Sequence, residues 1–169
     1  MTWSFELTPA DHPDADLMLR EYMDDVASRY YGRQATDKEL EDALEEMHSR
    51  DLVPPTGAFL LARRSGVLAG CGGVRIVAPG ISELTRVFLR HAERGKGGAA
   101  LLVTAAEDAA RDLGATVIRL DTRHDLVEAR ALYTRLGYDE VEPFNAEPYA
   151  EHWFSKSLVQ VPADLRLAP

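Results

Sequence analysis

Hydrophobic positions along this chain follow two periods, one typical of helices and one typical of strands. Apolar residues recur every three or four positions over residues 14–31 and 98–113, which predicts two amphipathic helices. A very acidic helix is expected over residues 36–48, because Thr36 and Glu39 have the spacing of a capping box. Shorter apolar runs bounded by turn residues predict strands over 3–7, 58–64, 67–77, 83–89, 116–122, 138–144 and 150–158.

The order of these elements predicts one α/β domain, which some classifications would place among α+β folds. Strands and helices are interleaved, and neither a linker nor an internal repeat divides the chain. We therefore expect a single domain over residues 1–158, followed by a loose tail over residues 159–169. Ser65 and Gly66 separate two of the apolar runs, and such a pair is typical of a tight hairpin turn.

Composition narrows the class of protein without identifying its function. The chain has 169 residues, a net charge of −9 and 46% hydrophobic residues, which suits a globular domain with a sizeable core. The acidic balance and the lack of a basic run argue against a nucleic-acid partner. No apolar run approaches the roughly 18 residues of a membrane span, and residues 1–14 lack the pattern of a signal peptide. Because Cys71 is the single cysteine, we expect a reducing cytoplasm and take Cys71 as a buried apolar residue.

A glycine-rich loop at residues 94–99 (RGKGGA) is the most informative feature of the sequence. It lies between the strand expected over 83–89 and the helix expected from Gly98. Such a turn directs unpaired backbone N–H groups outward at the positive end of the helix dipole, which favours a phosphate or pyrophosphate. Arg94 and Lys96 add positive charge to the loop. The spacing of the glycines fits neither a P-loop nor a dinucleotide-binding turn.

A second motif lies further along the chain, in residues 129–138 (ARALYTRLGY). Its apolar residues recur at helical spacing, and Gly137 follows them where the end of a helix favours a left-handed residue. Together with the pattern Arg94-x-x-Gly97-x-Ala99, this motif resembles the two signatures of the GCN5-related N-acetyltransferase (GNAT) superfamily. The resemblance extends over nearly the whole chain.

The resemblance implies the GNAT fold, a mixed central sheet of about seven strands flanked by about four helices. It also implies acetyl-CoA as co-substrate and direct attack by an amine in a ternary complex, with neither a metal nor a covalent nucleophile. In the family, the tyrosine that corresponds to Tyr133 points its hydroxyl at the thioester sulfur and protonates the leaving thiolate. From the residue pattern alone, Tyr133 is better explained as a packed aromatic on the helix.

Contacts with the cofactor follow from the same resemblance. The strand before the loop is expected to pair with the pantetheine arm, and the loop amides are expected to bind the pyrophosphate. The residues concerned are Val87, Phe88, Leu89, Arg94, Gly95, Lys96, Gly97, Gly98 and Ala99. Leu126 stands where many family members have an asparagine that contacts the cofactor, which puts that single contact in doubt.

Two residues are candidates for the base that accepts the amine proton. Glu83 aligns with the glutamate that some histone acetyltransferases of the superfamily use, and burial would raise its pKa as a carboxylate base requires. The alternative is that Glu83 only pairs with Arg86 or with neighbouring backbone. His152 has a suitable ordinary pKa, with shaping of the acceptor pocket or a plain strand position as its alternatives. No convincing cluster of metal ligands is evident.

The acceptor is the part of the function that the sequence leaves most open. Tyr31, Glu83, Tyr149 and His152 are the candidate substrate residues, because aromatic and acidic groups together suit a cationic amine. The alternative is that the acidic helix is only a solvated face. A small-molecule amine is the first expectation. A protein acetyltransferase for lysine or an N-terminus and a non-catalytic acyl-CoA-binding module are the alternatives, and use of a longer acyl-CoA stays open.

A homodimer is a further expectation, and no membrane partner is expected. We expect a dimer because members of the family commonly form dimers and because aromatic residues lie near the end of the domain. Tyr149, Trp153 and Phe154 would supply a self-complementary apolar patch.

Overall fold

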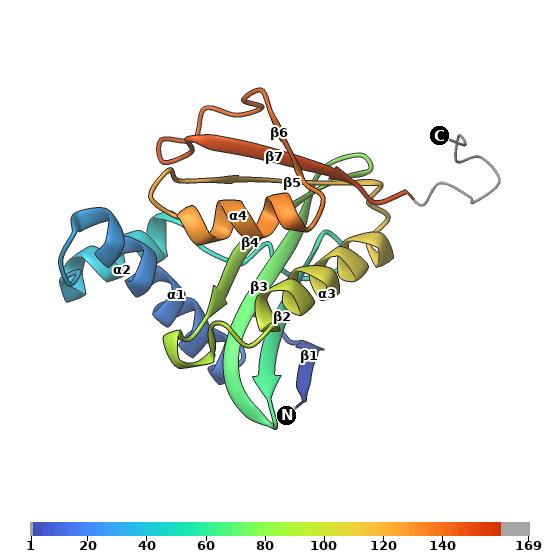
Figure 1. Ribbon diagram of the computed structural model, residues 1–169. Helices are drawn as coiled ribbons and strands as arrows, with labels where there is room; N and C mark the ends of the chain where they lie inside the picture. The colour runs from blue at the N-terminus through green and yellow to red at the C-terminus, as the bar shows by residue number, and fades with distance from the viewer. Residues whose placement is uncertain (1, 160–169) are drawn as a thin grey trace.

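The computed structural model describes residues 2–159, and within them the chain forms a seven-stranded mixed sheet with helices on both faces (Figure 1). The strands lie in the order β1-β2-β3-β4-β5-β7-β6, which confirms the expected mixed α/β fold. The elements are β1 (Trp3–Leu7), α1 (Pro13–Tyr31), α2 (Asp37–Glu46), β2 (Gly57–Arg64), β3 (Val67–Ala78), β4 (Ile81–Leu89), a 3₁₀ turn (His91–Glu93), α3 (Gly98–Asp112), β5 (Val117–Thr122), α4 (Val127–Arg135), β6 (Asp139–Val141) and β7 (His152–Ser157).

Local sequence signals act as expected at the ends of several elements. Thr36 and Glu39 form the reciprocal capping box that opens α2. Ser65 and Gly66 both have positive φ angles, 51° and 82°, as a two-residue hairpin turn between β2 and β3 requires. Gly137 follows α4 with a φ of 89°, which only glycine adopts without strain.

The strand expected over residues 138–144 is shorter than predicted. The structure has only Asp139–Val141 as β6, and residues 142–151 form an irregular connection to β7. Pro143 and Pro148 lie in this connection and lack the N–H that a sheet ladder needs, which explains the early end of the strand. Of the expected tail, residues 160–169 lie outside the described part of the chain.

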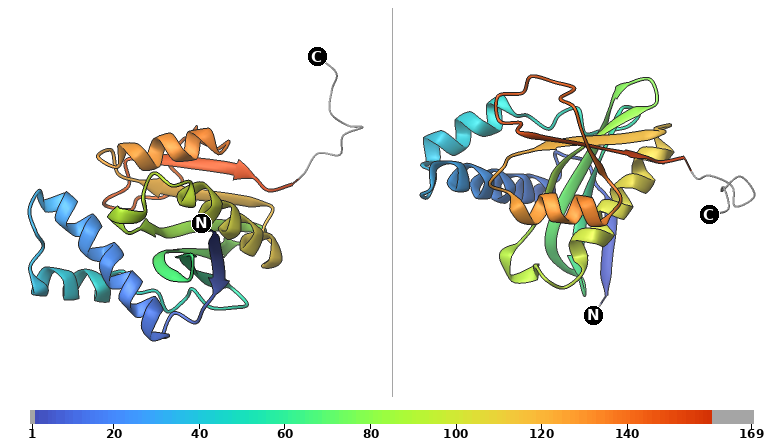
Figure 2. Two further views of the ribbon diagram at one scale, coloured as in Figure 1. Left: turned by 60° about the horizontal axis from the view of Figure 1, so that its bottom comes forward. Right: turned by 45° about the horizontal axis from the view of Figure 1, so that its top comes forward.

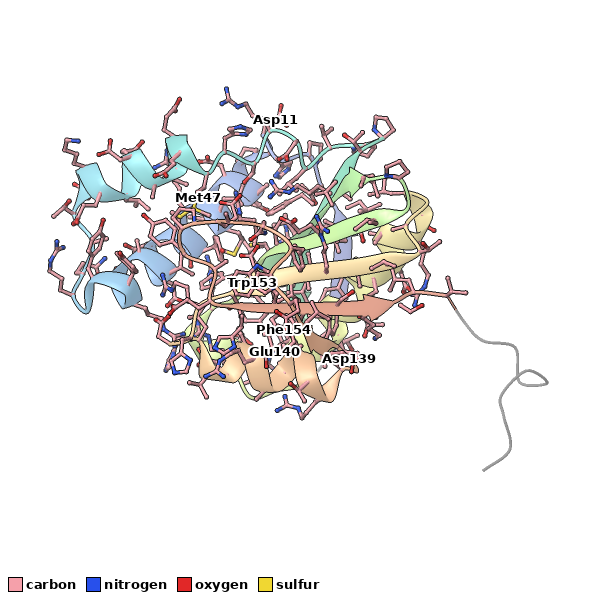
Figure 3. The ribbon with its side chains drawn as sticks, turned by 90° about the horizontal axis from the view of Figure 1, so that it is seen from above. Asp11, Met47, Asp139, Glu140, Trp153 and Phe154 are labelled. Carbon is pink, nitrogen blue, oxygen red and sulfur yellow. The ribbon has the colours of Figure 1, made fainter. Side chains whose placement is uncertain are left out.

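Two apolar clusters pack on opposite faces of the sheet. Alternate residues of β2 point to opposite sides, so that Phe59 and Leu61 join α1 in one cluster while Leu60 joins α3 and α4 in the other. The views from other directions agree, with α1 and α2 on one side of the sheet and α4 on the other (Figures 2 and 3). Cys71 is fully buried in the first of these clusters, as expected.

The sheet divides at its middle, between β4 and β5. These neighbouring strands run parallel, and their register covers only three pairs, from Ile81 opposite Val117 to Glu83 opposite Arg119. Beyond Glu83 the two strands diverge. A bulge in β4 accompanies this separation, because Arg86, at a φ of 58°, and Val87 interrupt the register with β3. The divergence leaves an opening between β4 and β5 that neither strand fills.

Candidate active site

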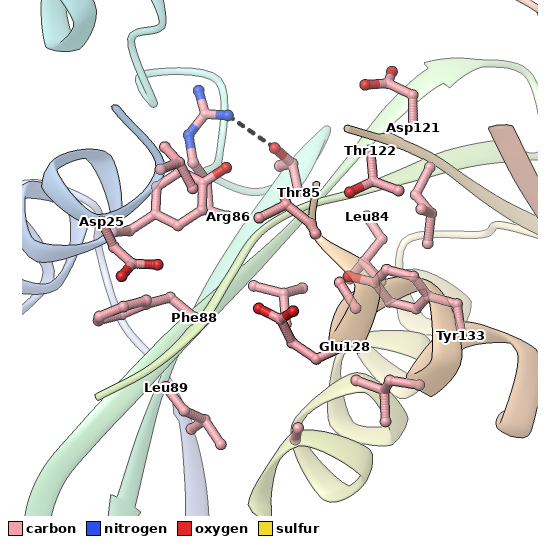
Figure 4. A pocket seen from close by; sticks show the side chains of 18 of the residues that line it. Asp25, Leu84, Thr85, Arg86, Phe88, Leu89, Asp121, Thr122, Glu128 and Tyr133 are labelled. Carbon is pink, nitrogen blue, oxygen red and sulfur yellow. Dashed lines mark hydrogen bonds between the residues drawn. The ribbon is translucent and has the colours of Figure 1, made fainter. Parts of the chain in front are cut away.

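A cleft of about 720 Å³ occupies the fork between β4 and β5. Its walls come from β4 and β5, the loop before α3, the N-terminal half of α3, α4, one face of α1, and the loop after α2. Figure 4 shows the side chains of β4 in the middle of this space, with α4 on one side and α1 on the other. The glycine-rich loop, the strand before it and the helix of the second motif therefore all reach the same cleft.

The glycine-rich loop lies at one end of the cleft. Gly95 and Gly97 have φ angles of 75° and 80°, and Gly97 is the N-cap of α3 without any side chain to cap it. Within residues 2–159, the amides of Gly95, Gly97 and Gly98 have no hydrogen-bond acceptor. Gly98 is buried against Trp3, where an added Cβ would lie 2.3 Å from the indole ring. The loop is therefore held in place from behind while its N–H groups stay available to an anion.

The two basic residues of the loop have different positions. Arg94 lines the cleft, donates to the Leu89 carbonyl at 2.9 Å, and lies 3.5 Å from a carboxylate oxygen of Asp25 on α1. Lys96 does not line the cleft, because its ammonium group turns back to the Ala92 carbonyl at 2.8 Å. Arg94 is thus the loop cation that faces a ligand in the cleft.

The floor of the cleft is the end of β4. Val87, Phe88 and Leu89 all line it, together with Leu126 from the loop before α4. The strands have separated here, so the edge of β4 that faces β5 has no neighbour in the described residues beyond Glu83. An extended ligand can pair with this edge as another strand would.

Tyr133 reaches the cleft from α4. Its ring is 7% exposed and packs against Tyr138 and Phe154, with centroids 5.6 and 6.1 Å away. Figure 4 shows the hydroxyl pointing away from α4 toward β4. Within the described residues this hydroxyl has no hydrogen-bond partner, and burial raises the pKa of Tyr133 well above its ordinary value. The group is therefore a protonated donor aimed into the cleft.

Glu83 lies at the point where the fork opens and is 13% exposed. Its carboxylate accepts from the guanidinium of Arg75, its partner across the β3–β4 ladder, at 2.8 Å. Arg75 also bonds Asp51 at 3.1 Å. Glu83 therefore does form an ion pair, as the alternative to a catalytic role expected, but its partner is Arg75 and not Arg86.

Arg86 instead joins β4 to the loop after α2. Its guanidinium donates to Thr85 and to the carbonyls of Met47 and His48, at 2.9, 2.8 and 3.4 Å. The bond to Thr85 is visible in Figure 4. Arg86 thereby fixes one wall of the cleft.

Asp121, near the end of β5, is a cleft residue that sequence reasoning did not assign. Burial, followed by the nearby charge of Glu83, raises the pKa of its carboxyl group, although a hydrogen bond from Asn145 at 2.8 Å opposes the shift. Asn145 in turn accepts from the indole of Trp153 at 2.9 Å. The only signal in the sequence was an acidic residue beside the end of a strand, and that pattern is common.

The candidate substrate residues do not all come together. Tyr31 and Tyr149 line a second, smaller pocket of about 180 Å³, and Tyr149 lines the main cleft as well. His152 lines neither. Its ring bonds Glu140 on β6 at 2.5 Å and His124 at 2.9 Å. The structure thus brings Glu83 and the two tyrosines to connected cavities and leaves His152 outside them.

The aromatic patch expected to support a dimer is not continuous. Phe154 is 3% exposed and belongs to the core of its own chain, because alternate residues of β7 face opposite sides of the sheet. The side chain of Trp153 bonds Asn145, and the ring of Tyr149 packs on Tyr30. The dimer remains a prediction, without this patch to support it.

No group of His, Cys, Asp and Glu side chains among residues 2–159 is arranged to hold a metal ion. No helix in this part of the chain combines the length and apolarity needed to cross a membrane.

Comparison with known proteins agrees with the site. The acetyltransferase (GNAT) family profile matches residues 19–138. An uncharacterized N-acetyltransferase of Schizosaccharomyces pombe, C1271.07c, is 30% identical over 142 residues, which cover 83% of each chain.

Among solved structures, a GNAT-family acetyltransferase from Staphylococcus aureus Mu50 has a TM-score of 0.73 at 15% identity, covering 94% of this chain and 100% of that one. The PaiA N-acetyltransferase of Thermoplasma acidophilum, solved with coenzyme A, has a TM-score of 0.66 at 20% identity, covering 91% and 99%. This chain belongs to the acetyltransferase (GNAT) family and, as a member, is an acyltransferase.

Proposed function

We propose that this protein transfers the acetyl group of acetyl-CoA to the primary amine of a small molecule. The observation that carries the proposal is the forked cleft, which has free N–H groups at one end and which Tyr133, Glu83 and Asp121 line where the strands diverge. Solved relatives with the same fold include the PaiA enzyme, whose structure contains coenzyme A.

The residues present fit coenzyme A. The amides of Gly95, Gly97 and Gly98 and the guanidinium of Arg94 would hold the pyrophosphate, because they combine free donors with a positive charge. The unpaired edge of β4 at residues 87–89 would pair with the pantetheine arm. Leu126 offers an apolar contact where other members have an asparagine.

The chemistry then takes place at the fork. The amine nitrogen attacks the thioester carbonyl carbon, a C–N bond forms, and the C–S bond breaks with its electron pair going to sulfur. The Tyr133 hydroxyl donates a proton to the departing thiolate, since its raised pKa keeps it protonated until that moment. The surplus proton on nitrogen passes to a carboxylate on the opposite side.

Among the carboxylates that line the cleft, Glu83 and Asp121 lie where β4 and β5 diverge, and we consider these two for the role of proton acceptor. The carboxylate of Glu83 is already held by a direct ion pair with Arg75 at 2.8 Å. Asp121 makes no ion pair within the described residues, and its pKa is raised. We therefore propose Asp121 as the proton acceptor, directly or through water, and Glu83 as the neighbour whose charge sustains the raised pKa.

The shape of the acceptor side supports a small molecule. α2 and the 142–151 connection lie over this end of the cleft, and Tyr149 meets Tyr30 of α1 with ring centroids 5.2 Å apart. A peptide needs an open groove on both sides of the reacting nitrogen, and this contact closes one side.

The test is thiol release from acetyl-CoA in the presence of a panel of small amines and of a lysine-containing peptide. We expect release with at least one small amine and little release with the peptide. Faster release with the peptide would favour the protein acetyltransferase, and tight binding of acetyl-CoA with no release for any amine would favour the non-catalytic alternative.

A further inference from the structure

The second pocket opens from the acceptor end of the main cleft, between α1, α2 and the 142–151 connection. The two cavities share eight lining residues, Tyr22, Val26, Glu46, Met47, Asp121, Thr122, Leu126 and Tyr149. The two cavities therefore lie next to each other, and Asp121 lies at their common boundary. A molecule whose nitrogen lies beside Asp121 would extend its remaining atoms into the smaller pocket.

The wall of this pocket is largely apolar and aromatic. Met23, Ala27 and Ala43 contribute aliphatic surface, and Tyr30, Tyr31 and Tyr149 contribute rings at the opening. The three tyrosines are 56%, 45% and 44% exposed, so a cluster of large apolar side chains faces water at one place. Such a cluster indicates a surface that an apolar partner covers.

The pocket offers no available cation. Among its described lining residues, Arg123 is the one positive side chain, and it donates to both carboxylate oxygens of Asp125 at 2.9 Å and to the Val26 carbonyl at 2.7 Å. In the adjoining part of the cleft, Arg75 and Arg86 are engaged with Glu83 and with backbone carbonyls. A substrate carboxylate would therefore enter without a guanidinium to pair with it.

Negative charge, in contrast, is available at the junction. Asp121 and Glu46 both line the two cavities, and neither makes an ion pair within the described residues. Glu39, also in the pocket, is held by Arg33 and by its capping contact with Thr36. A protonated amine is thus attracted to the junction, while the depth of the pocket lacks a free charge for a second ionic group.

We infer that this pocket holds the body of the acceptor, and that the acceptor is a primary amine with a compact aromatic or apolar body and no carboxylate. The inference rests on the proposed acetyl transfer and assigns its substrate class. The volume of about 180 Å³ suits one ring, since an engineered apolar cavity of about 150 Å³ takes up benzene.

The experiment compares three amines with the full chain and acetyl-CoA. Phenethylamine presents the expected body, phenylalanine adds a carboxylate to it, and putrescine replaces the ring with a second cation. We expect kcat/KM for phenethylamine to exceed the values for the other two at least tenfold. A higher value for phenylalanine or putrescine would overturn the inference while leaving acetyl transfer intact.

A second experiment fills the smaller pocket by substitution and measures the effect on the acceptor amine. Ala43→Phe places a ring in the pocket from α2, and Ala131→Phe places the same ring on the exposed face of α4, outside both cavities. We expect Ala43→Phe to raise KM for phenethylamine at least tenfold and to leave the calorimetric Kd for acetyl-CoA unchanged, and Ala131→Phe to change neither.

The result for Ala43→Phe separates the two proposals. An unchanged KM in the folded variant would show that the acceptor body lies elsewhere. If that variant does not fold, Ala27→Leu on α1 gives the same readout from the opposite wall. Acetyl-CoA binding with no acetylation of any of the three amines would contradict the inference, and failure of the wild type to bind acetyl-CoA would contradict the proposed function itself.

Discussion

Tyr133 and Asp121 line the same cleft from different elements, one at the buried face of α4 and the other near the end of β5. Desolvation raises the pKa of Tyr133 and the pKa of Asp121, but the two shifts have opposite effects on proton transfer. The raised pKa keeps Tyr133 protonated, so that it can donate a proton. The raised pKa makes Asp121 a better proton acceptor near neutral pH. The proposed proton transfers therefore follow from where the fold places two ordinary side chains.

Replacing Tyr133 by phenylalanine tests whether its hydroxyl donates a proton to the departing thiolate. The ring contacts with Tyr138 and Phe154 stay, so the melting temperature and the Kd for acetyl-CoA should not change. Turnover should fall by about 10²-fold, the lower end of the range for a general acid, because a thiol is not a very basic leaving group. Steady-state kinetics on one amine measure this, and equal turnover numbers would make Tyr133 a packing residue.

Asp121→Asn has an expected effect on stability as well as on rate. Because the folded pKa is raised, protonation of Asp121 favours the fold, and this contribution is complete below the ordinary value of about 3.9 and lost as pH rises through the folded pKa. The neutral asparagine should therefore raise the melting temperature at pH 7, and the gain should shrink as pH falls toward that value.

The same variant should lose the acidic limb of the kcat/KM profile, which the wild type owes to ionisation of the base. Melting curves and pH profiles of the two proteins check both points. A lower melting temperature at pH 7, or an unchanged acidic limb, would contradict the role given to Asp121.

The sequence could identify a site residue only where that residue stands in a recognisable local motif. Tyr133 stands in a recognisable motif, so its place in the cleft was expected. Asp121 has no such motif, and its importance arises from desolvation and from Glu83 on another strand. The partner of Glu83 depended on the β3–β4 register, which sets Arg75 opposite Glu83, and the sequence does not specify that register.

Among the elements, the loop before α3 is the one whose backbone N–H groups we expect to bind the ligand. Its two left-handed glycines turn N–H groups into the cleft, and Trp3 packs behind Gly98 and donates to the Lys96 carbonyl at 3.1 Å. The loop is thus shaped before a ligand arrives, which reduces the entropy lost on binding.

Substitution at Gly97 separates charge from backbone strain. Gly97→Asp and Gly97→Asn have nearly the same shape and the same cost at a φ of 80°, and no atom lies within 4 Å of the added Cβ. The aspartate should weaken acetyl-CoA binding at least tenfold more than the asparagine, because its charge faces the pyrophosphate. Calorimetric titration measures the two Kd values, and equal affinities would place the pyrophosphate elsewhere.

Helices and most strands were predictable because periodicity and caps reinforce each other, as in the capping box of α2. β6 was overestimated because apolar residues suggested a longer strand, while the prolines of the 142–151 connection ended it. That connection carries Tyr149 to the second pocket, so the part of the fold that was least predictable also lines the pocket to which we assign the acceptor.

At the scale of the whole molecule, the candidate active site is a cleft where the sheet divides between β4 and β5. Most parts of the fold contribute to its walls or to the pocket beside it, which are lined from α1, α2, β4, β5, α3, α4 and the 142–151 connection. The sequence indicated one end of this cleft through its glycine-rich loop, and cofactor binding there stays a prediction. It did not indicate the second pocket, because residues from α1, α2 and the connection meet there only after folding.

The most direct test of the account is the balance between thiol released and amide formed by the wild-type protein. With acetyl-CoA and phenethylamine, we expect one N-acetylated amine for each free thiol, and no thiol above the uncatalysed background when the amine is left out. Direct acetyl transfer requires both results. Thiol release that does not need an amine, or that yields acetate in place of the amide, would contradict the central claim.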